Sequence, residues 1–177
     1  MTVRPVFETP YERKGILAPG LPILPDGVER YPIPPCGSRS VQIRKGDEIT
    51  LLDREGLQQG ELVFFAPDGT SDAGMIGAVG CGAATGIQSV LGDGSRSGAK
   101  VLQALNNAGF DLGQSDCVRV FSQGSKAGDM ASFAAASDGL LVAAAPGTAL
   151  RPEEQNSPTE LIIYIKRANQ GEGQPDN

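Results

Sequence analysis

The sequence contains no histidine among its 177 residues. Histidine is the side chain whose ordinary pKa suits proton transfer near neutral pH, and it is a common metal ligand. Its absence excludes every Ser-His-Asp and Cys-His mechanism within this chain, and it excludes metal sites built on imidazole. Acid–base chemistry would fall to Asp, Glu, Lys, Cys or Tyr, or to a partner chain.

Tryptophan and long apolar runs are also missing. No apolar segment approaches the roughly 20 residues that cross a bilayer. The N-terminal MTVRPVFETPYERKG has acids and prolines where a signal peptide needs an apolar segment. We therefore expect a cytoplasmic protein that does not bind membranes. The formal net charge of −6 also argues against a nucleic-acid partner, because an acidic surface repels phosphate backbones.

Cysteine is scarce, and the three residues Cys36, Cys81 and Cys117 are an odd number at wide spacing. This pattern does not resemble a disulfide framework. Cys81 lies between two glycines, so one interpretation is an exposed nucleophilic thiol whose pKa is lowered by a helix N-terminus. The sequence favours the other interpretation, a small buried cysteine.

The distribution of proline divides the chain. Eight of the thirteen prolines lie in residues 1–35. Proline fixes φ and has no backbone donor, so we expect an extended arm there that packs over the domain or onto a partner. Residues 36–168 are long enough for a single domain with one sizeable core. The polar residues 169–177 are expected to form a disordered tail.

Short apolar runs separated by turn residues predict strands on both sides of one helix. Val101, Leu102 and Leu105 have helical spacing, and Gly109 supplies a stop, which predicts a helix over 97–108. The predicted strands cover residues 41–43, 49–52, 61–66, 117–122, 131–136, 140–145 and 159–166. We therefore expect an α+β, mostly β domain with a barrel-like antiparallel sheet and a helical insertion near the middle.

The stretch GMIGAVGCGAATGIQSVLGDG (74–94) raises the question of phosphate binding. Gly80, Gly82 and Gly86 give the spacing G-x-G-x-x-x-G, which differs from the dinucleotide fingerprint G-x-G-x-x-G. The residues before it form a poor strand, no acid sits at the end of a following parallel strand to bind a ribose, and no P-loop Lys-Ser/Thr pair is present. The pattern favours a loop in which glycine permits close approach, and such a loop can line a pocket.

Acidic residues flank two predicted hairpins, with Asp53, Glu55 and Glu61 at one and Asp129 and Asp138 at the other. Paired carboxylates can bind a cationic substrate or a metal. They can equally solvate turns and accept backbone hydrogen bonds, and the sequence favours this second interpretation.

Four segments resemble the urea-carboxylase-associated family. DREGLQQGELVFFA (53–66) resembles the family's D-x-x-G-x-Q-x-x-D-x-x-x-Y strand-turn-strand, and IPPCGSRSVQIRKGDEITLLD (33–53) is similar to the hairpin before it. Residues 128–167 resemble its G-D-Y-V-x-L-R-A segment and final strand, and residues 106–123 are similar to the stretch between. The resemblance covers roughly residues 33 to 167.

This resemblance implies a β-barrel-like fold related to the folate-binding domain of aminomethyltransferases. It also implies a role beside urea carboxylase, where some members are paired subunits that hydrolyse carboxyguanidine to allophanate and ammonia. The family's glutamine falls on Gln58, its two aspartates on Asp53 and Glu61, and its Gly-Asp pair on Gly128 and Asp129.

The sequence departs from the family pattern where metal ligands would be expected. The family's central histidine and cysteine segment is replaced here by the glycine-rich run, and its Cys-Pro is Ala145-Pro146. Because zinc needs about four ligands, usually led by thiolates or imidazoles, we expect no metal and no cofactor.

We therefore hypothesise a divergent member of this family that binds or processes a guanidine- or urea-type metabolite, as one subunit of an amidine hydrolase. The predicted substrate-binding residues are Asp53, Gln58, Glu61, Cys81 and Asp129. Carboxylates accept the paired N–H donors of guanidinium groups well. We expect a homo- or hetero-oligomer. The alternative is a non-enzymatic assembly or ligand-binding subunit that has lost the family's metal site.

Overall fold

The computed structural model describes residues 24–94, 96–121, 124–147 and 157–168. Within these ranges the chain forms short strands with a helical segment between the fourth and fifth. The strands are β1 (Val28–Ile33), β2 (Ser38–Ile43), β3 (Glu48–Asp53), β4 (Gly60–Phe65), β5 (Cys117–Val120), β6 (Asp129–Ala134), β7 (Gly139–Ala144) and β8 (Leu161–Lys166). The helices are η1 (Ala73–Ile76), α1 (Thr85–Leu91), α2 (Arg96–Asn107) and η2 (Leu112–Gln114), of which η1 and η2 are 3-10 helices.

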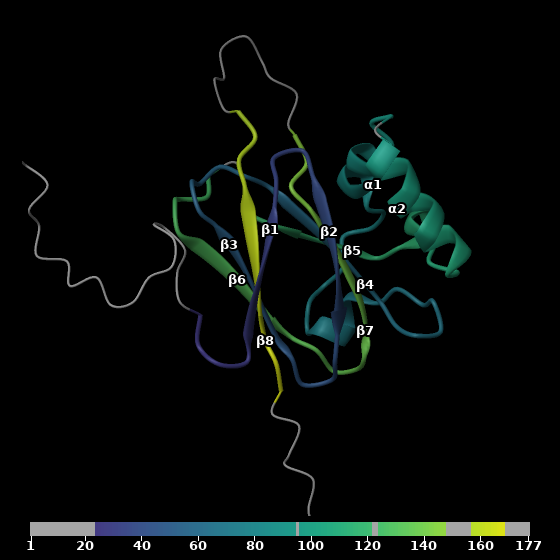
Figure 1. The fold of residues 1–177 in the computed structure, drawn as a ribbon, viewed down its shortest axis with the longest axis horizontal. Coiled ribbons are helices and arrows are strands. Elements are labelled where there is room, and N and C mark those ends of the chain that lie inside the picture. Colours follow the sequence, from purple (N-terminus) through teal and green to yellow (C-terminus); the bar gives the residue numbers. More distant parts are fainter. Residues whose placement is uncertain (1–23, 95, 122–123, 148–156, 169–177) are drawn as a thin grey trace, which may run out of the picture.

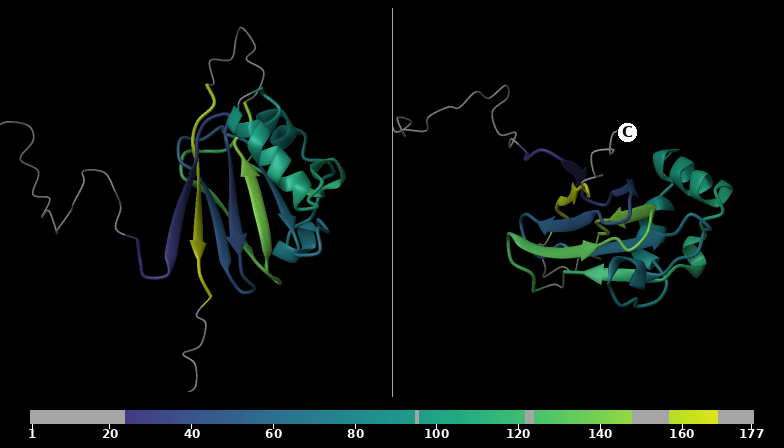
Figure 2. Two further views of the ribbon diagram at one scale, coloured as in Figure 1. Left: turned by 45° about the vertical axis from the view of Figure 1, so that its right-hand side comes forward. Right: turned by 90° about the horizontal axis from the view of Figure 1, so that it is seen from below.

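The strands form two antiparallel sheets of four strands each. The first sheet has the order β1-β8-β3-β6 and the second the order β2-β7-β4-β5. The two sheets stack as layers, which is clearest in the right-hand view of Figure 2. The predicted α+β, mostly β class is confirmed, and α1 and α2 form the helical insertion. The two sheets do not close into a barrel within the described residues, so the expected barrel-like sheet is a sandwich instead.

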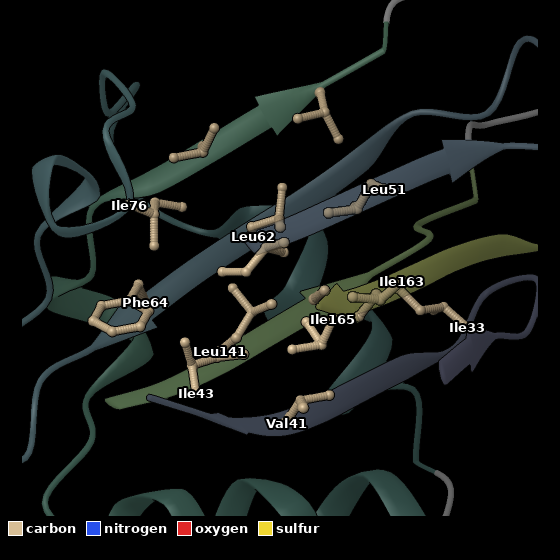
Figure 3. Close-up of a cluster of buried hydrophobic side chains, with 14 of the residues drawn as sticks. Ile33, Val41, Ile43, Leu51, Leu62, Phe64, Ile76, Leu141, Ile163 and Ile165 are labelled. Atoms are coloured by element: carbon tan, nitrogen blue, oxygen red, sulfur yellow. The ribbon is translucent and has the colours of Figure 1, made fainter. Parts of the chain in front are cut away.

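The main core lies between the two sheets. Alternate residues of each strand point inward, as the two-residue period of a strand requires. In β3, for example, Ile49 and Leu51 are fully buried between more accessible neighbours. Figure 3 shows side chains of both sheets meeting in this layer. Burying each large aliphatic side chain contributes about 1.5–3 kcal/mol, which makes this layer the main source of stability.

Strand β4 is buried on both faces, and its neighbour β7 is buried in the same way along most of its length. Leu62 and Phe64 face the layer between the sheets, whereas Val63 and Phe65 belong to a second apolar cluster on the outer face. This outer cluster is covered by α1 and α2, which lie together on one side of the sandwich (Figure 1). The LVFF run (62–65) is therefore continuously apolar because two layers pack against it, and the single acid in this strand, Glu61, stands out.

The structure places β1 within the range that the sequence assigns to the proline-rich arm. It pairs with β8 at the edge of the first sheet, where Pro32 requires no ladder partner on its outer side. Residues 1–23 of the predicted arm and the predicted tail 169–177 lie outside the described residues. Among the helices that the structure describes, none has the length and apolar character needed to cross a membrane.

Candidate functional site

Glu61 is the acid at the start of β4, and it is only 5% exposed. Its Oε2 accepts a hydrogen bond of 2.9 Å from the backbone N–H of Ile87 in the first turn of α1. Its Oε1 accepts a hydrogen bond of 3.2 Å from Nε of Arg119, which faces it across the β4–β5 ladder. A buried carboxylate is tolerated only with such partners. Glu61 therefore joins β4, β5 and α1 through one charged group.

The glycine-rich run adjoins this ion pair and packs against the outer edge of β5. The backbone N–H of Cys81 donates to the carbonyl of Cys117 at 2.8 Å, and the N–H of Cys117 donates to the carbonyl of Gly82 at 2.8 Å. A Cβ added at Gly80 would lie 1.8 Å from a carboxylate oxygen of Asp116. The run is thus a segment of close approach, as the sequence indicates, and it covers an otherwise unpaired strand edge.

The same run contains α1, which the sequence does not predict. A helix N-terminus can bind phosphate through its free N–H groups. Here the first turn of α1 is held by the chain's own carboxylate, because Ile87 donates to Glu61. The glycine at the second position of the helix is also required by this contact, since a Cβ at Gly86 would lie 2.8 Å from Cδ of Glu61. This arrangement gives no support to phosphate binding.

A cavity of about 390 Å³ opens beside the Glu61–Arg119 pair. The lining residues combine three polar side chains with apolar walls, and they are Gln59, Gly60, Glu61, Arg119, Phe121 and Pro146. Two further cavities of about 300 and 290 Å³ lie elsewhere among the described residues. Only the first of these three contains a buried carboxylate paired with a guanidinium. A concave site with a few convergent polar groups is the usual form of a small-molecule site.

The two charges of the cavity differ in exposure. The side chain of Glu61 is 7% exposed, whereas that of Arg119 is 50% exposed. The hydrogen bond to Glu61 is the main reason that the pKa of Arg119 is raised above its usual value, so this guanidinium stays positively charged. Its Nη2 lies 3.5 Å from the carbonyl of Ala83, and Nη1 has no hydrogen-bond partner among the described residues. Arg119 can therefore donate to a bound molecule while it remains fixed by Glu61.

Phe121 follows β5 and has a φ of +58°, in the left-handed region that a non-glycine residue rarely adopts. Backbone conformations of this kind cost about 1–3 kcal/mol and persist where the surroundings enforce them. Together with Pro146 it provides the apolar part of the cavity wall.

Two of the sequence-predicted site residues, Asp53 and Gln58, lie behind the cavity rather than in its wall. Asp53 is fully buried. Its Oδ1 accepts from the N–H of Gly56 at 2.9 Å, and its Oδ2 accepts from the N–H of Gln58 at 3.2 Å and from the hydroxyl of Ser125 at 2.8 Å. Asp53 thus fixes the turn between β3 and β4.

Gln58 connects this turn to the cavity wall. Its Nε2 donates to the carbonyls of Gln59 at 2.7 Å and Pro146 at 3.0 Å, and both of these residues line the cavity. Its Oε1 accepts from the backbone N–H of Thr159 at 2.8 Å. All of the hydrogen bonds described for this amide go to the protein backbone, which suits a residue that positions the wall.

The other two predicted residues lie elsewhere. Asp129 is exposed at the first position of β6, where its Oδ2 accepts from the backbone N–H of Lys126 in the preceding turn at 2.8 Å. Cys81 is exposed, so the expectation of a buried cysteine was wrong. The reason is that the run lies on the outer edge of β5, where nothing described covers it. Of the five predicted residues, the structure therefore places only Glu61 in the cavity wall.

Sequence reasoning missed Arg119, Gln59 and Phe121. The signal for Arg119 is present in the segment CVRV, where one cation interrupts an apolar strand. Its partner is 58 residues away, so no local pattern could pair it with Glu61. In the described part of the chain, no group of three or more cysteine or acidic side chains is placed to hold a metal ion.

No family model matches the chain. The chain is 33% identical over 163 residues to trimethylamine-oxide aldolase of Ruegeria pomeroyi. This match covers 92% of the chain but only 21% of that enzyme's length. A DUF1989 family protein from Silicibacter pomeroyi has a crystal structure that matches with a TM-score of 0.47 and 16% identity, over 81% of this chain and 80% of that one.

The resemblance to the urea-carboxylase-associated family stays a prediction, because both proteins carry other names. The chain is thus homologous to a segment of an enzyme named for its action on a small nitrogen compound.

Proposed function

We propose that this chain binds a small, polar nitrogen compound in the cavity beside the Glu61–Arg119 pair. The observation that carries the proposal is the presence of a buried carboxylate, a half-exposed guanidinium and an aromatic residue around one cavity of about 390 Å³. Such cavities commonly enclose small ligands with a few polar groups that fix their orientation.

The charges favour a compound that carries both an anionic oxygen and a cationic nitrogen. Arg119 neutralises Glu61, so a purely cationic ligand would compete with the guanidinium for the carboxylate. Nη1 of Arg119, which has no hydrogen-bond partner in the part of the chain that the structure describes, suits a negatively charged oxygen, because charge-assisted hydrogen bonds are the strong ones. The aromatic residue Phe121 suits a methylated cationic nitrogen, which binds favourably over an aromatic face.

Amine N-oxides have this combination of charges. The homologous segment of an enzyme named trimethylamine-oxide aldolase supports the same class, since that name specifies an N-oxide of a methylated amine. Guanidine- and urea-type compounds, which the resemblance to the urea-carboxylase-associated family implies, form the competing class. They would require Arg119 to release Glu61 before a guanidinium could reach the carboxylate.

Isothermal titration calorimetry with trimethylamine N-oxide, trimethylamine, guanidinium and urea would test the proposal. Trimethylamine N-oxide has about five non-hydrogen atoms, and about 1.5 kcal/mol per atom is the ceiling for such ligands, so we expect a Kd in the micromolar to millimolar range. We expect trimethylamine, which lacks the oxygen, to bind at least about tenfold more weakly, equivalent to about 1.4 kcal/mol.

A matched pair of variants connects the binding to the cavity. Arg119→Lys keeps the charge but removes the planar set of donors, and we expect it to weaken N-oxide binding at least about tenfold. Arg39→Lys is the control, because Arg39 is an exposed arginine in β2 at the opposite edge of the same sheet. Equal affinity of both variants and the unaltered protein, or tighter binding of guanidinium than of the N-oxide, would reject the proposal.

A further inference from the structure

Cys81 and Cys117 lie side by side although they are 36 residues apart in the sequence. The backbone N–H of Cys81 donates to the carbonyl of Cys117 at 2.8 Å, and the N–H of Cys117 donates to the carbonyl of the residue after Cys81 at 2.8 Å. Two segments joined by backbone hydrogen bonds in this way lie about 5 Å apart. This separation falls within the range of about 4.4–6.8 Å that disulfides span.

The side chains point in the direction that a bond would need. Sγ of Cys81 lies 3.2 Å from the carbonyl oxygen of Cys117, so the exposed thiol is turned toward the other residue. Cys81 is also among the neighbouring groups that raise the pKa of Cys117, as expected for two thiols that lie near each other. We propose that Cys81 and Cys117 are a reversible dithiol site that forms an intramolecular disulfide on reaction with a peroxide.

The two thiols differ in exposure, which assigns their roles. Cys81 is exposed and Cys117 is fully buried. Burial, followed by the negative charge of Glu61 and the neighbouring Cys81, raises the pKa of Cys117 to about 12. Susceptibility to oxidation follows exposure and thiolate character, so the peroxide reacts first at Cys81. Cys117 is protected from direct oxidation and acts second.

The chemistry balances in two steps. The thiolate of Cys81 attacks one peroxide oxygen, the O–O bond breaks, and the products are a sulfenic acid and one water. The sulfur of Cys117 then attacks the sulfenic sulfur, the S–O bond breaks, and a second water leaves as the disulfide forms. Two thiols are oxidised and one hydrogen peroxide is reduced. A thiol reductant reverses the change by exchange.

The position of this bond also links it to the cavity. Cys117 and Arg119 are two residues apart in β5, so their side chains lie on the same face of the sheet. A disulfide would fasten the glycine-rich run to β5 next to the Glu61–Arg119 pair. The proposal does not depend on which compound the cavity binds, because its test uses no ligand.

Peptide mapping gives a direct test with the full chain. The folded protein is treated with a small excess of hydrogen peroxide, unreacted thiols are alkylated, and the protein is digested with trypsin. Cys81 lies in the peptide 55–96 and Cys117 in the peptide 101–119, so the predicted disulfide joins two separate peptides. We expect this crosslink, a mass loss of about 2 Da per chain and full reversal by dithiothreitol.

Serine variants separate the roles. Cys36→Ser is the matched control and should keep the crosslink, since Cys36 is exposed in the turn before β2, at the opposite edge of the second sheet. In Cys117→Ser we expect a sulfenic acid at Cys81 that dimedone traps. If Cys117→Ser does not fold, the presence or absence of the crosslink in the unaltered protein decides the question. Full alkylation of both thiols after peroxide, sulfinic acid at Cys81 without the crosslink, or a disulfide to Cys36 or between chains would overturn the proposal.

Discussion

Replacing Asp53 by alanine tests the role that the structure gives to this buried carboxylate. The substitution removes the acceptor of three hydrogen bonds, from the N–H groups of Gly56 and Gln58 and the hydroxyl of Ser125. Hydrogen bonds to charged groups contribute about 1.5–3 kcal/mol each, and the lower value applies because the three share one carboxylate. We therefore expect Asp53→Ala to lower the free energy of unfolding by about 4 kcal/mol.

For a domain of this size, a loss of about 4 kcal/mol corresponds to a fall in melting temperature of about 8–16 °C. Asp53→Asn should cost roughly half as much, since its amide oxygen can still accept from Gln58 and Ser125 while its N–H group faces the donor of Gly56. Asp129→Ala is the matched control. This carboxylate also accepts from a turn N–H but is exposed, so we expect a loss below about 1 kcal/mol.

Urea denaturation followed by circular dichroism measures these differences, and calorimetry then measures N-oxide binding by the folded fraction of each variant. The account predicts a large loss of stability with unchanged affinity. A loss below about 1 kcal/mol for Asp53→Ala would contradict the assigned role of the buried hydrogen bonds. A stable Asp53→Ala variant with abolished binding would instead make Asp53 a ligand-binding residue.

Two further predictions concern acid stability and close packing. Burial raises the pKa of Asp47, but hydrogen bonds from two backbone N–H groups and from Arg167 outweigh it, so the pKa is lowered overall. The stabilisation by the Asp47 carboxylate is complete above its unfolded pKa of about 4 and is lost as the pH falls through the lower folded value. Arg167→Ala removes one of these hydrogen bonds and should therefore move the midpoint of acid unfolding to higher pH. An unchanged midpoint in a pH titration followed by circular dichroism would contradict this. Gly86→Ala should destabilise by about 1–3 kcal/mol because its Cβ would lie 2.8 Å from Cδ of Glu61. A helical Gly→Ala change otherwise stabilises by up to about 1 kcal/mol, so a raised melting temperature would refute the contact.

The strands could be predicted because their signal is local. Val41 and Ile43, or Ile49 and Leu51, alternate with polar or exposed neighbours, and turn residues bound each run. The helix over 97–108 matches α2 closely for the same reason, since its apolar residues have helical spacing. Local patterns were therefore sufficient for the class of fold and for most of its elements.

The elements that sequence reasoning missed depend on distant partners. α1 has no side-chain cap of its own, and its first turn is held by Glu61, which is 26 residues away from Ile87. β1 contains a proline and forms a strand only because β8, at the other end of the chain, pairs with it. Neither relationship leaves a periodic pattern in the sequence.

The candidate site was likewise predictable only where its residues carry a local signal. From the residues alone, the acids near turns were interpreted as groups that solvate the turns, and the resemblance to the urea-carboxylase-associated family placed Glu61 and Asp53 in the predicted site. Sequence alone could not distinguish a carboxylate that accepts three internal hydrogen bonds from one that lines a cavity. The guanidinium of Arg119 decides that difference, and it reaches Glu61 only through the β4–β5 register.

The location of the bound compound tests the central claim most directly. Amide chemical shifts of nitrogen-15-labelled protein, followed during titration with trimethylamine N-oxide, report which backbone groups surround it. The account predicts saturable shifts that are largest at Gly60, Glu61, Arg119 and Phe121, which line the cavity beside the ion pair. Saturable shifts centred instead on Gly139 or another residue of the second cavity, or no shifts at millimolar ligand, would contradict it.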